Sequence, residues 1–337
     1  MIKTPPKLAP GSTIALIAPS FGVNIEPYFS RLEQAIRNLT KLGYKIKTGP
    51  NVYLGDGEVA SASPKARAKE FMDAYLDDEV NLILSVGGGE LMNEMLPYVD
   101  FSLIGQSAPK WFMGFSDNTN LCFLIPILSG VKTIYGPNAP SFCEYPLRLN
   151  QLDAIKLLQG EANSILGYPK WSFGNKPEDP YLKKTSYRKI SKIEGFNYDG
   201  PRQGTLIGGC LDCLLTLVGT RFDGFASFSD EHKGIIFYLE SCDLNPISFR
   251  RGLWQLREAL YFQSAKLIMF GRPLHWGERM FGVSFKQAAK SVLGDLGIPL
   301  LFDCPLGHLP PSMPMVNGAK ARVSYEGDLL RIDYLDM

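Results

Sequence analysis

The chain has 337 residues, of which 45% are hydrophobic and 20% are charged, and its formal net charge is +1. This composition is typical of an ordinary globular protein, and the small net charge excludes a broad basic surface for nucleic acid or an anionic membrane. The length favours two domains over a single core. No apolar run reaches the ~20 residues that span a bilayer, and residues 1–7 have no apolar signal region. We therefore expect a cytoplasmic protein whose six cysteines are reduced.

Strands and helices are predicted to alternate in the first half of the chain. Compact apolar runs predict strands at 13–18, 44–47, 81–86 and 110–113, and helical periodicity predicts helices at 28–42, 63–76 and 91–96. Ser63 and Pro64 are suited to the start of the second helix. This alternation indicates βαβ units and a mostly parallel sheet, whose ligands bind beyond the carboxyl ends of the strands. The glycines at 87–89 and the turn at Ser116 both follow such strand ends.

The turn after the strand at 110–113 carries the first candidate catalytic residue. Gly114 permits a sharp turn, Ser116 follows, and Asp117, Asn118 and Thr119 offer N-cap chemistry to a helix that runs through residue 124. Nucleophilic serines of α/β enzymes occupy such strand-to-helix turns, usually as G-x-S-x-G. Asn118 replaces the second glycine, so the match is partial. The alternative is that Ser116 is only a cap residue.

Residues 168–200 differ from their surroundings because glycine, proline, lysine and aromatic residues dominate without clear periodicity. A segment of this length and composition is typical of a linker or an active-site lid. We interpret it as a linker that also contributes a substrate loop. Its aromatic residues, which include Trp171 and Tyr181, suit a ligand with a flat face, and its basic residues suit an anionic group. The alternative is a plain solvated linker.

The second half repeats the alternation. Strands are predicted at 203–207, 234–239, 266–270 and 300–302, helices at 248–261 and 285–296, and a hairpin at 323–334. Gly208 and Gly209 are predicted to lead into a helix that ends near Leu217. Cys210 and Cys213 form a C-x-x-C at its start. A zinc site would need two further ligands. A redox pair is possible, but buried structural thiols are favoured.

A serine nucleophile needs a base, a group that orients the base, and donors for the oxyanion. His308 follows a strand within a proline-rich loop that limits its freedom, so it is preferred over His275, and His232 lies in a polar turn. Glu240 ends the most apolar strand of the second half, where a charge is costly unless it is paired. It can orient the histidine, or it can point into solvent. The backbone N–H groups of the 87–89 loop and of Asp117 can stabilise the oxyanion. The loop matches neither G-x-G-x-x-G nor a P-loop, so a phosphate site is the weaker interpretation.

Several features in this order resemble the LD-carboxypeptidase family of serine peptidases, which includes the microcin C immunity (MccF-type) proteins. They are residues 11–20, the glycine loop, residues 114–119, 206–209, 239–240 and 305–308. The resemblance covers nearly the whole chain. It implies an α/β fold with a Rossmann-like or flavodoxin-like parallel-sheet domain, for which we expect residues 1–167. The linker and substrate loop then occupy 168–200, and a swivelling β/α domain occupies 201–337.

The resemblance also implies roles for individual residues. The family's Ser–Glu–His triad falls on Ser116, Glu240 and His308, and its oxyanion hole falls on the backbone N–H groups of Gly88 and Asp117. In the MccF-type branch a loop aromatic residue stacks on adenine, a role that falls on Trp171 or Tyr181, and Gly89 is a further expected substrate contact. Members need no metal and are typically homodimers, so we expect no cofactor. Glu90 and Cys210 depart from the family pattern and bear on substrate recognition.

These observations predict an MccF-like serine carboxypeptidase that hydrolyses an amide bond in a small peptide or an aminoacyl-nucleotide. A murein tetrapeptide LD-carboxypeptidase of cell-wall recycling is the first alternative. A non-peptidase acyl hydrolase with the same triad and a catalytically silent ligand-binding protein are the others. Neither nucleic acid nor a membrane is expected as a partner.

Overall fold

The computed structural model describes residues 2–55, 59–176 and 179–337, which form two compact units. The first unit comprises Met1–Ala162, Asn175–Thr185 and Pro314–Asn317, and the second comprises Asn163–Gly174, Ser186–Met313 and Gly318–Met337. The domain limits expected from the sequence, 1–167, 168–200 and 201–337, stay a prediction. Residues 177–178 of the expected substrate loop lie outside the described residues.

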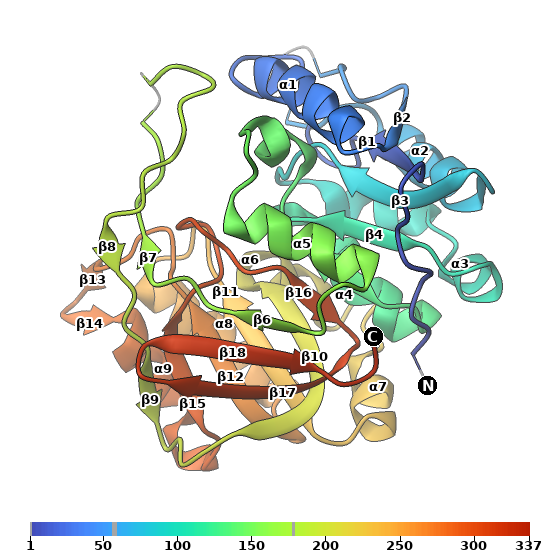
Figure 1. Cartoon of the computed structure of the whole chain (residues 1–337). Coiled ribbons are helices and arrows are strands. Elements are labelled where there is room, and N and C mark those ends of the chain that lie inside the picture. Colours follow the sequence, from blue (N-terminus) through green and yellow to red (C-terminus); the bar gives the residue numbers. More distant parts are fainter. Residues whose placement is uncertain (1, 56–58, 177–178) are drawn as a thin grey trace. The chain divides into compact units, whose positions relative to one another are not determined.

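The first unit contains a mostly parallel sheet (Figure 1). Its strands are β1 (Thr13–Ile17), β2 (Lys45–Thr48), β3 (Val80–Ser85), β4 (Trp111–Gly114), β5 (Thr133–Tyr135) and β16 (Met315–Asn317), in the order β16-β5-β4-β3-β1-β2. β16 alone among these pairs antiparallel, with β5. The helices are α1 (Tyr28–Lys41), α2 (Pro64–Leu76), α3 (Phe101–Gln106), α4 (Thr119–Leu124) and α5 (Leu149–Gln159). Shorter turns of helix are η1 (Met92–Tyr98), η2 (Ser116–Asn118), η3 (Ile125–Ser129) and η4 (Ala139–Cys143).

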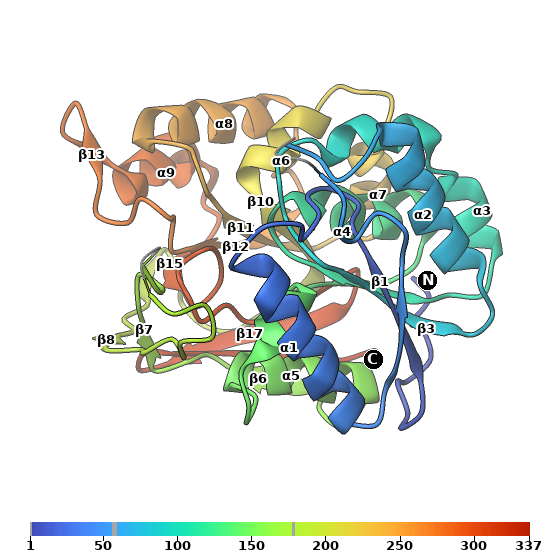
Figure 2. The same ribbon diagram turned by 90° about the horizontal axis from the view of Figure 1, so that it is seen from above.

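Helices cover both faces of this sheet. The reason is the strand order: β2 pairs with one side of β1 and β3 with the other, so the connections before and after this reversal lie on opposite faces. Figure 2 shows α1 on one face and α2 with α3 on the other. α2 begins as the sequence predicts, with the Ser63 side chain accepting from the Ala66 N–H and Pro64 in the first turn. Every residue of β1 is buried, as is typical of a parallel strand covered on both faces. The doubly wound parallel sheet that the sequence predicts is therefore confirmed.

The second unit is built on a mixed sheet in the order β6-β18-β17-β10-β11-β12-β15-β9. Its strands are β6 (Ser164–Leu166), β9 (Glu194–Phe196), β10 (Arg202–Cys210), β11 (Ile235–Glu240), β12 (Ala265–Gly271), β15 (Leu300–Cys304), β17 (Lys320–Glu326) and β18 (Leu329–Tyr334). Two small ribbons are formed by β7 (Lys170–Trp171) with β8 (Lys189–Ile190) and by β13 (Arg279–Met280) with β14 (Val283–Ser284). Its helices are α6 (Leu211–Leu217), α7 (Phe225–Glu231), α8 (Pro246–Glu258), α9 (Phe285–Leu293) and the turn η5 (Gly294–Leu296).

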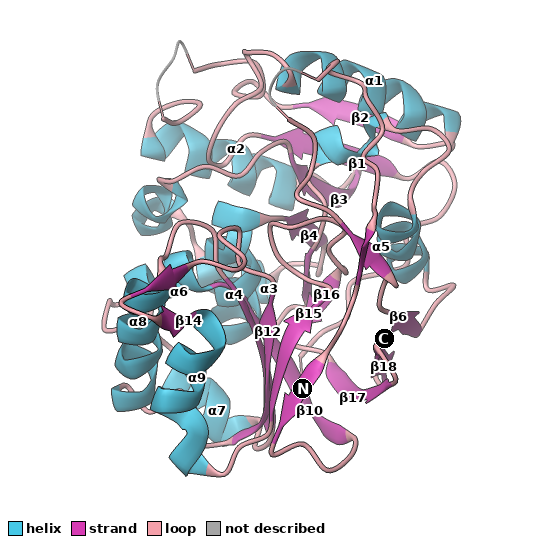
Figure 3. Cartoon of the chain, turned by 90° about the vertical axis from the view of Figure 1, so that its left-hand side faces the viewer, coloured by secondary structure: helices cyan, strands magenta, loops and turns pink. Residues whose placement is uncertain are grey.

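The strands β10, β11, β12 and β15 are parallel neighbours, so the carboxyl ends of all four meet at one edge. Figure 3 shows α6, α7, α8 and α9 together on one side of this sheet. β11 is buried along its whole length and places Glu240 at the edge as its last residue. This is the sheet edge at which α/β proteins bind ligands.

Four features differ from the predictions. β10 continues through Gly208 and Gly209 to Cys210, so the two glycines belong to the strand and not to the following helix. The helix expected at 91–96 is the 3-10 helix η1. The segment 168–200 contains β7, β8 and β9, which are too short for a periodic signal. β16 was not predicted for the same reason.

Candidate functional site

Ser116 lies on a strained turn immediately after β4. Its φ is 66°, in the left-handed region that residues other than glycine rarely adopt. Such a conformation costs on the order of 1–2 kcal/mol and persists when neighbouring groups hold it. Here the Ser116 N–H donates to the Tyr135 hydroxyl at 3.0 Å, and the Phe115 N–H donates to Asn138 Oδ1 at 2.8 Å. The backbone therefore has the geometry of a nucleophile elbow.

Asp117 and Asn118 support this turn but do not cap the helix as the sequence suggested. Asn118 occupies the N-cap of α4 without a side-chain capping bond. Its Nδ2 instead donates to the carbonyl oxygens of Gly87 at 2.8 Å and Phe115 at 2.9 Å. The buried Asp117 carboxylate accepts from the Ser20 hydroxyl and from the Met92 N–H at 2.8 Å. Both side chains thereby fasten the elbow to backbone groups of the neighbouring loops.

The glycine loop after β3 lies directly against Ser116. A Cβ at Gly88 would lie 2.9 Å from the Ser116 Cβ and 3.2 Å from its Oγ, so a side chain there would collide with the serine. Gly89 has a φ of 145°, and a Cβ there would overlap the Ser20 hydroxyl. The glycines are thus required for this close approach of backbone to the serine. The structure brings Ser116, Gly88 and Asp117 together within the first unit.

Glu240 and His308 form a buried pair in the second unit. His308 Nδ1 lies 2.6 Å from Glu240 Oε2, and the two side chains are 14% and 0% exposed. This distance is that of a charge-assisted hydrogen bond. Nδ1 of His308 is therefore engaged by Glu240. The structure thus brings together the two side chains that the sequence predicts as orienter and base.

The loop that carries His308 is held closely against Glu240. At Gly307, where φ is 104°, an added Cβ would lie 3.0 Å from the Glu240 Cβ. The Gly307 N–H donates to the Ser312 hydroxyl at 3.0 Å, and the Arg272 N–H donates to the Leu306 carbonyl at 3.2 Å. Because both ends of the turn are bonded to the fold, the imidazole has little freedom.

The pKa of His308 responds to two opposing effects. Burial lowers the pKa of the imidazolium, while the Glu240 carboxylate and side-chain hydrogen bonds to Cys242 and Glu240 raise it. The attractive interactions prevail, and the pKa lies well above its usual range. Such a histidine is a strong base whose protonated form is stabilised by its partner, as a triad requires.

The other two histidines are placed differently. His275 is about half exposed, and its Nδ1 lies 3.6 Å from Glu278 Oε2. His232 ends α7 and packs against the Phe228 ring, and burial lowers its pKa. Of the three histidines, His308 is the one that the structure places against Glu240, and its role as the base stays a prediction.

The two aromatic residues of the expected substrate loop have different surroundings. Trp171 is only 4% exposed. Its ring packs edge-on against Phe173 and Trp276, with the Arg272 guanidinium 5.2 Å from the ring centroid. Tyr181 belongs to the first unit and is 46% exposed, and its carbonyl accepts from Arg31 Nε at 2.7 Å. Tyr181 therefore has ring surface to offer a ligand, whereas Trp171 supports the fold around it.

Residues that sequence reasoning missed hold the catalytic candidates in place. Asp212, in the first turn of α6, accepts from the Cys242 N–H at 3.2 Å and the Asp243 N–H at 2.8 Å. It thereby fixes the turn that follows Glu240. Tyr135 and Asn138 hold the Ser116 turn from β5 and the segment after it. Only Asn138, a polar residue close behind a strand end, gave a signal that could have been noticed.

The cysteines of the chain are free thiols. Cys210 is buried and Cys213 is half-buried. Across residues 2–55, 59–176 and 179–337, no cluster of three or more His, Cys, Asp or Glu side chains is arranged to hold a metal ion. Among the helices of the same residues, none has the length and apolar character needed to cross a membrane.

Comparison with known proteins assigns the family. Residues 14–136 match the LD-carboxypeptidase N-terminal domain, and residues 203–323 match the LD-carboxypeptidase C-terminal domain. The chain belongs to the LD-carboxypeptidase family. It is therefore a serine-type carboxypeptidase, and the family that the sequence resembled is confirmed.

Two relatives match this chain over nearly its whole length. The chain is 26% identical to the microcin C7 self-immunity protein MccF of Escherichia coli, over 96% of this chain and 94% of that protein. It is also 26% identical to a probable murein peptide carboxypeptidase of Bacillus subtilis, over 95% and 91%.

Solved structures share the fold. MccF in complex with glutamyl sulfamoyl guanosine has a TM-score of 0.84 at 22% identity, over 99% of each chain. A muramoyltetrapeptide carboxypeptidase from Oxalobacter formigenes has a TM-score of 0.73 at 23% identity, over 96% of this chain and 99% of that one. The α/β architecture with two domains is thus confirmed.

Proposed function

We propose that this enzyme hydrolyses an amide bond in a small peptide or an aminoacyl-nucleotide through Ser116, Glu240 and His308. The observation that carries the proposal is the 2.6 Å contact between the buried Glu240 carboxylate and His308 Nδ1. A carboxylate in this position selects the tautomer in which Nε2 accepts a proton. The strained Ser116 turn supplies the second element, because such a turn projects a hydroxyl from the sheet edge.

Each residue has a distinct role in the proposed reaction. Ser116 Oγ attacks the carbonyl carbon while His308 takes its proton, and the backbone N–H groups of Gly88 and Asp117 stabilise the oxyanion. His308 then gives the proton to the leaving amine, and the C–N bond breaks. Water, activated by His308, releases the acyl group from Ser116. Glu240 stabilises the imidazolium in both steps without being protonated itself.

Two substrate classes follow from the relatives. MccF binds aminoacyl sulfamoyl nucleosides, as the complex with glutamyl sulfamoyl guanosine records, and other relatives are named for murein peptides. We propose an aminoacyl-nucleotide or a small peptide as the substrate of this enzyme, with a murein tetrapeptide as the alternative. The segment 168–200 is proposed to contribute a substrate loop with Tyr181 as its ligand-facing ring and Trp171 as a further contact. Gly89, in the loop after β3, is proposed as another contact.

The cellular compartment and the oligomeric state of the enzyme are also proposals. Free thiols at all the described cysteines support a reducing compartment, and we propose the cytoplasm. The homodimer that the family resemblance implies is proposed as the assembly state. Light scattering at several protein concentrations measures it directly.

The test is a mass-spectrometric assay of the wild type and Ser116→Ala with two substrates. One is a murein tetrapeptide that ends in D-Ala, and the other is an aminoacyl sulfamoyl adenosine. Serine-dependent release of D-Ala identifies a cell-wall LD-carboxypeptidase, and serine-dependent cleavage of the nucleoside conjugate alone identifies an MccF-type enzyme. Turnover that persists in Ser116→Ala contradicts the proposed mechanism.

A further inference from the structure

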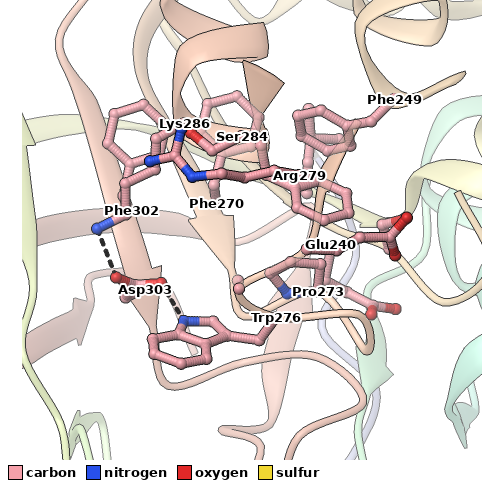
Figure 4. A pocket seen from close by; sticks show the side chains of 16 residues that line it. Glu240, Phe249, Phe270, Pro273, Trp276, Arg279, Ser284, Lys286, Phe302 and Asp303 are labelled. Carbon is pink, nitrogen blue, oxygen red and sulfur yellow. Dashed lines mark hydrogen bonds and ion pairs between the residues drawn. The ribbon is translucent and has the colours of Figure 1, made fainter. Parts of the chain in front are cut away.

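A cavity of about 240 Å³ opens in the second unit beside the catalytic pair (Figure 4). It lies at the carboxyl ends of β11, β12 and β15, and α8 and α9 close its far side. Glu240, the partner of His308, belongs to its wall. A group bound here lies one side chain away from the proposed base.

Aromatic rings form the inner wall of this cavity. Phe270 and Phe302 stack at a centroid distance of 5.3 Å, and Phe249 meets Phe270 edge-on at 5.8 Å. Phe285 meets Phe249 edge-on at 5.3 Å. These rings present both faces and edges to the cavity, which favours a further aromatic ring over an aliphatic chain. The volume suits one ring rather than a large ligand.

Charged side chains define the rim. Asp303 accepts from the Trp276 indole N–H at 3.1 Å and pairs with Lys286 at 2.6 Å, and Lys286 also pairs with Glu194 at 2.8 Å. The charge of Lys286 is therefore compensated within the protein. Figure 4 shows the two contacts of Asp303 and the neighbouring Arg279 side chain, which extends across the cavity.

Arg279 differs from Lys286 because it faces no carboxylate at bonding distance. Its guanidinium donates to the Gly282 carbonyl at 2.9 Å and the Gln287 amide oxygen at 3.3 Å, and it makes no ion pair within the described residues. A guanidinium with donors to spare beside an aromatic pocket favours a ligand in which a ring and an anionic group lie close together.

We propose that this cavity binds the leaving residue of the peptide and selects a C-terminal aromatic amino acid. The aromatic side chain enters between the phenylalanine rings, and the terminal carboxylate pairs with Arg279. This inference rests on the proposed carboxypeptidase function, because a carboxypeptidase releases a residue that carries both groups. It goes further by assigning a side-chain preference and the residues that enforce it.

The experiment compares tetrapeptides that differ only in the last residue, D-Ala or D-Phe. For the wild type we expect kcat/KM to be at least about tenfold higher for the D-Phe peptide than for the D-Ala peptide. Burial of the aromatic ring in a matching pocket accounts for a difference of this size. Phe302→Leu should remove most of this difference. Arg279→Gln should raise KM for both peptides, because both end in a carboxylate.

Matched controls separate the cavity from general effects. Phe237→Leu removes an equally buried ring of β11 that is no part of the cavity wall, and Arg322→Gln removes an exposed charge on β17. Both should keep the D-Phe preference. Equal turnover of the two peptides by the wild type, or an unchanged preference in Phe302→Leu, overturns the inference while leaving the proposed function intact.

Binding to Ser116→Ala tests the cavity without turnover. Calorimetry should show tighter binding of the D-Phe peptide than of the D-Ala peptide, and the difference should vanish when Phe302→Leu is added. Equal affinities overturn the inference. Cleavage of an aminoacyl sulfamoyl adenosine that is slowed by Phe302→Leu would also overturn it, because the occupant would then be a nucleobase. If the wild type shows no serine-dependent turnover but Ser116→Ala still binds the D-Phe peptide more tightly than the D-Ala peptide, the proposed function alone is refuted.

Discussion

Replacing Glu240 by Gln tests the pairing at the centre of the proposed site. The substitution keeps the size of the side chain and removes its charge. The Glu240 side chain is 0% exposed and meets His308 Nδ1 at 2.6 Å, so water cannot replace the lost carboxylate. An amide no longer stabilises the imidazolium and can hold the wrong tautomer. We expect kcat to fall by about 10³- to 10⁴-fold, the scale known for the equivalent change in a serine protease triad.

The pH profile should change in a defined direction. In the wild type the raised pKa of His308 places the rising limb of kcat/KM above the usual histidine range of about 6.5, because only the neutral imidazole accepts a proton. In Glu240→Gln the attraction of the carboxylate, the largest effect that raises the pKa, is gone, while burial, which lowers the pKa, and the Cys242 contact remain. The rising limb should therefore move to lower pH while the plateau falls.

Stability gives an independent measurement of the same pair. A group whose pKa is raised on folding contributes stability that is complete below its unfolded pKa and is lost as pH rises through its folded pKa. Glu240→Gln should therefore destabilise the protein more at about pH 6 than at about pH 9, by about 3 kcal/mol at the lower pH. Urea unfolding at the two pH values measures this difference.

The control is Glu231→Gln, which removes an exposed glutamate next to His232 on α7. It should leave both the pH profile and the plateau unchanged. If Glu240→Gln has the pH profile and plateau of the wild type, Glu240 does not act on the catalytic base and the reasoning is refuted.

Four further predictions concern the nucleophile turn of the first unit and Trp171 of the second. Ser116→Ala and Ser116→Gly should both lose activity. The glycine variant should be more stable than the alanine variant by about 1 kcal/mol, because glycine accepts the positive φ at this position. Thermal unfolding of the two variants measures this difference. Gly88→Ala should lower kcat at least about tenfold through collision with Ser116, whereas Gly294→Ala, which meets only ordinary contacts, should be neutral in the same assay. Asp117→Asn should reduce the free energy of unfolding by about 1–3 kcal/mol, because one of the two accepting oxygens becomes an NH2 group that faces buried donors. Urea titration measures this. Trp171→Ala should cost about 3–5 kcal/mol if the ring is a packing element, and a small change with a large rise in KM would instead support a ligand contact.

Much of the fold could be predicted because its elements carry strong local signals. The buried strands β1, β3, β11 and β12 are short apolar runs, and α2 begins at the expected Ser63 and Pro64. The extension of β10 through two glycines could not be predicted, since glycine is normally unfavourable in strands. β16 joins the first sheet from a distant part of the sequence, and no local pattern reports such a pairing.

The candidate site was predictable in residue type more than in geometry. Glu240 was identified because an acid at the end of an apolar strand needs a partner, and the structure places His308 at it. The side chain of Asn118 was expected to cap α4 and instead binds the glycine loop, because Gly87 presents a carbonyl that only the folded chain brings near. The cavity beside Glu240 is assembled from three strand ends and two helices, so its aromatic wall had no counterpart in the sequence pattern.

The most direct test of the account is to trap the acyl-enzyme. The wild type is mixed with a murein tetrapeptide or an aminoacyl sulfamoyl adenosine, quenched in acid, digested and analysed by mass spectrometry. The account predicts an acyl group esterified to Ser116, absent from Ser116→Ala and reduced in His308→Gln. An adduct on a different residue, or full product formation by Ser116→Ala, would contradict it.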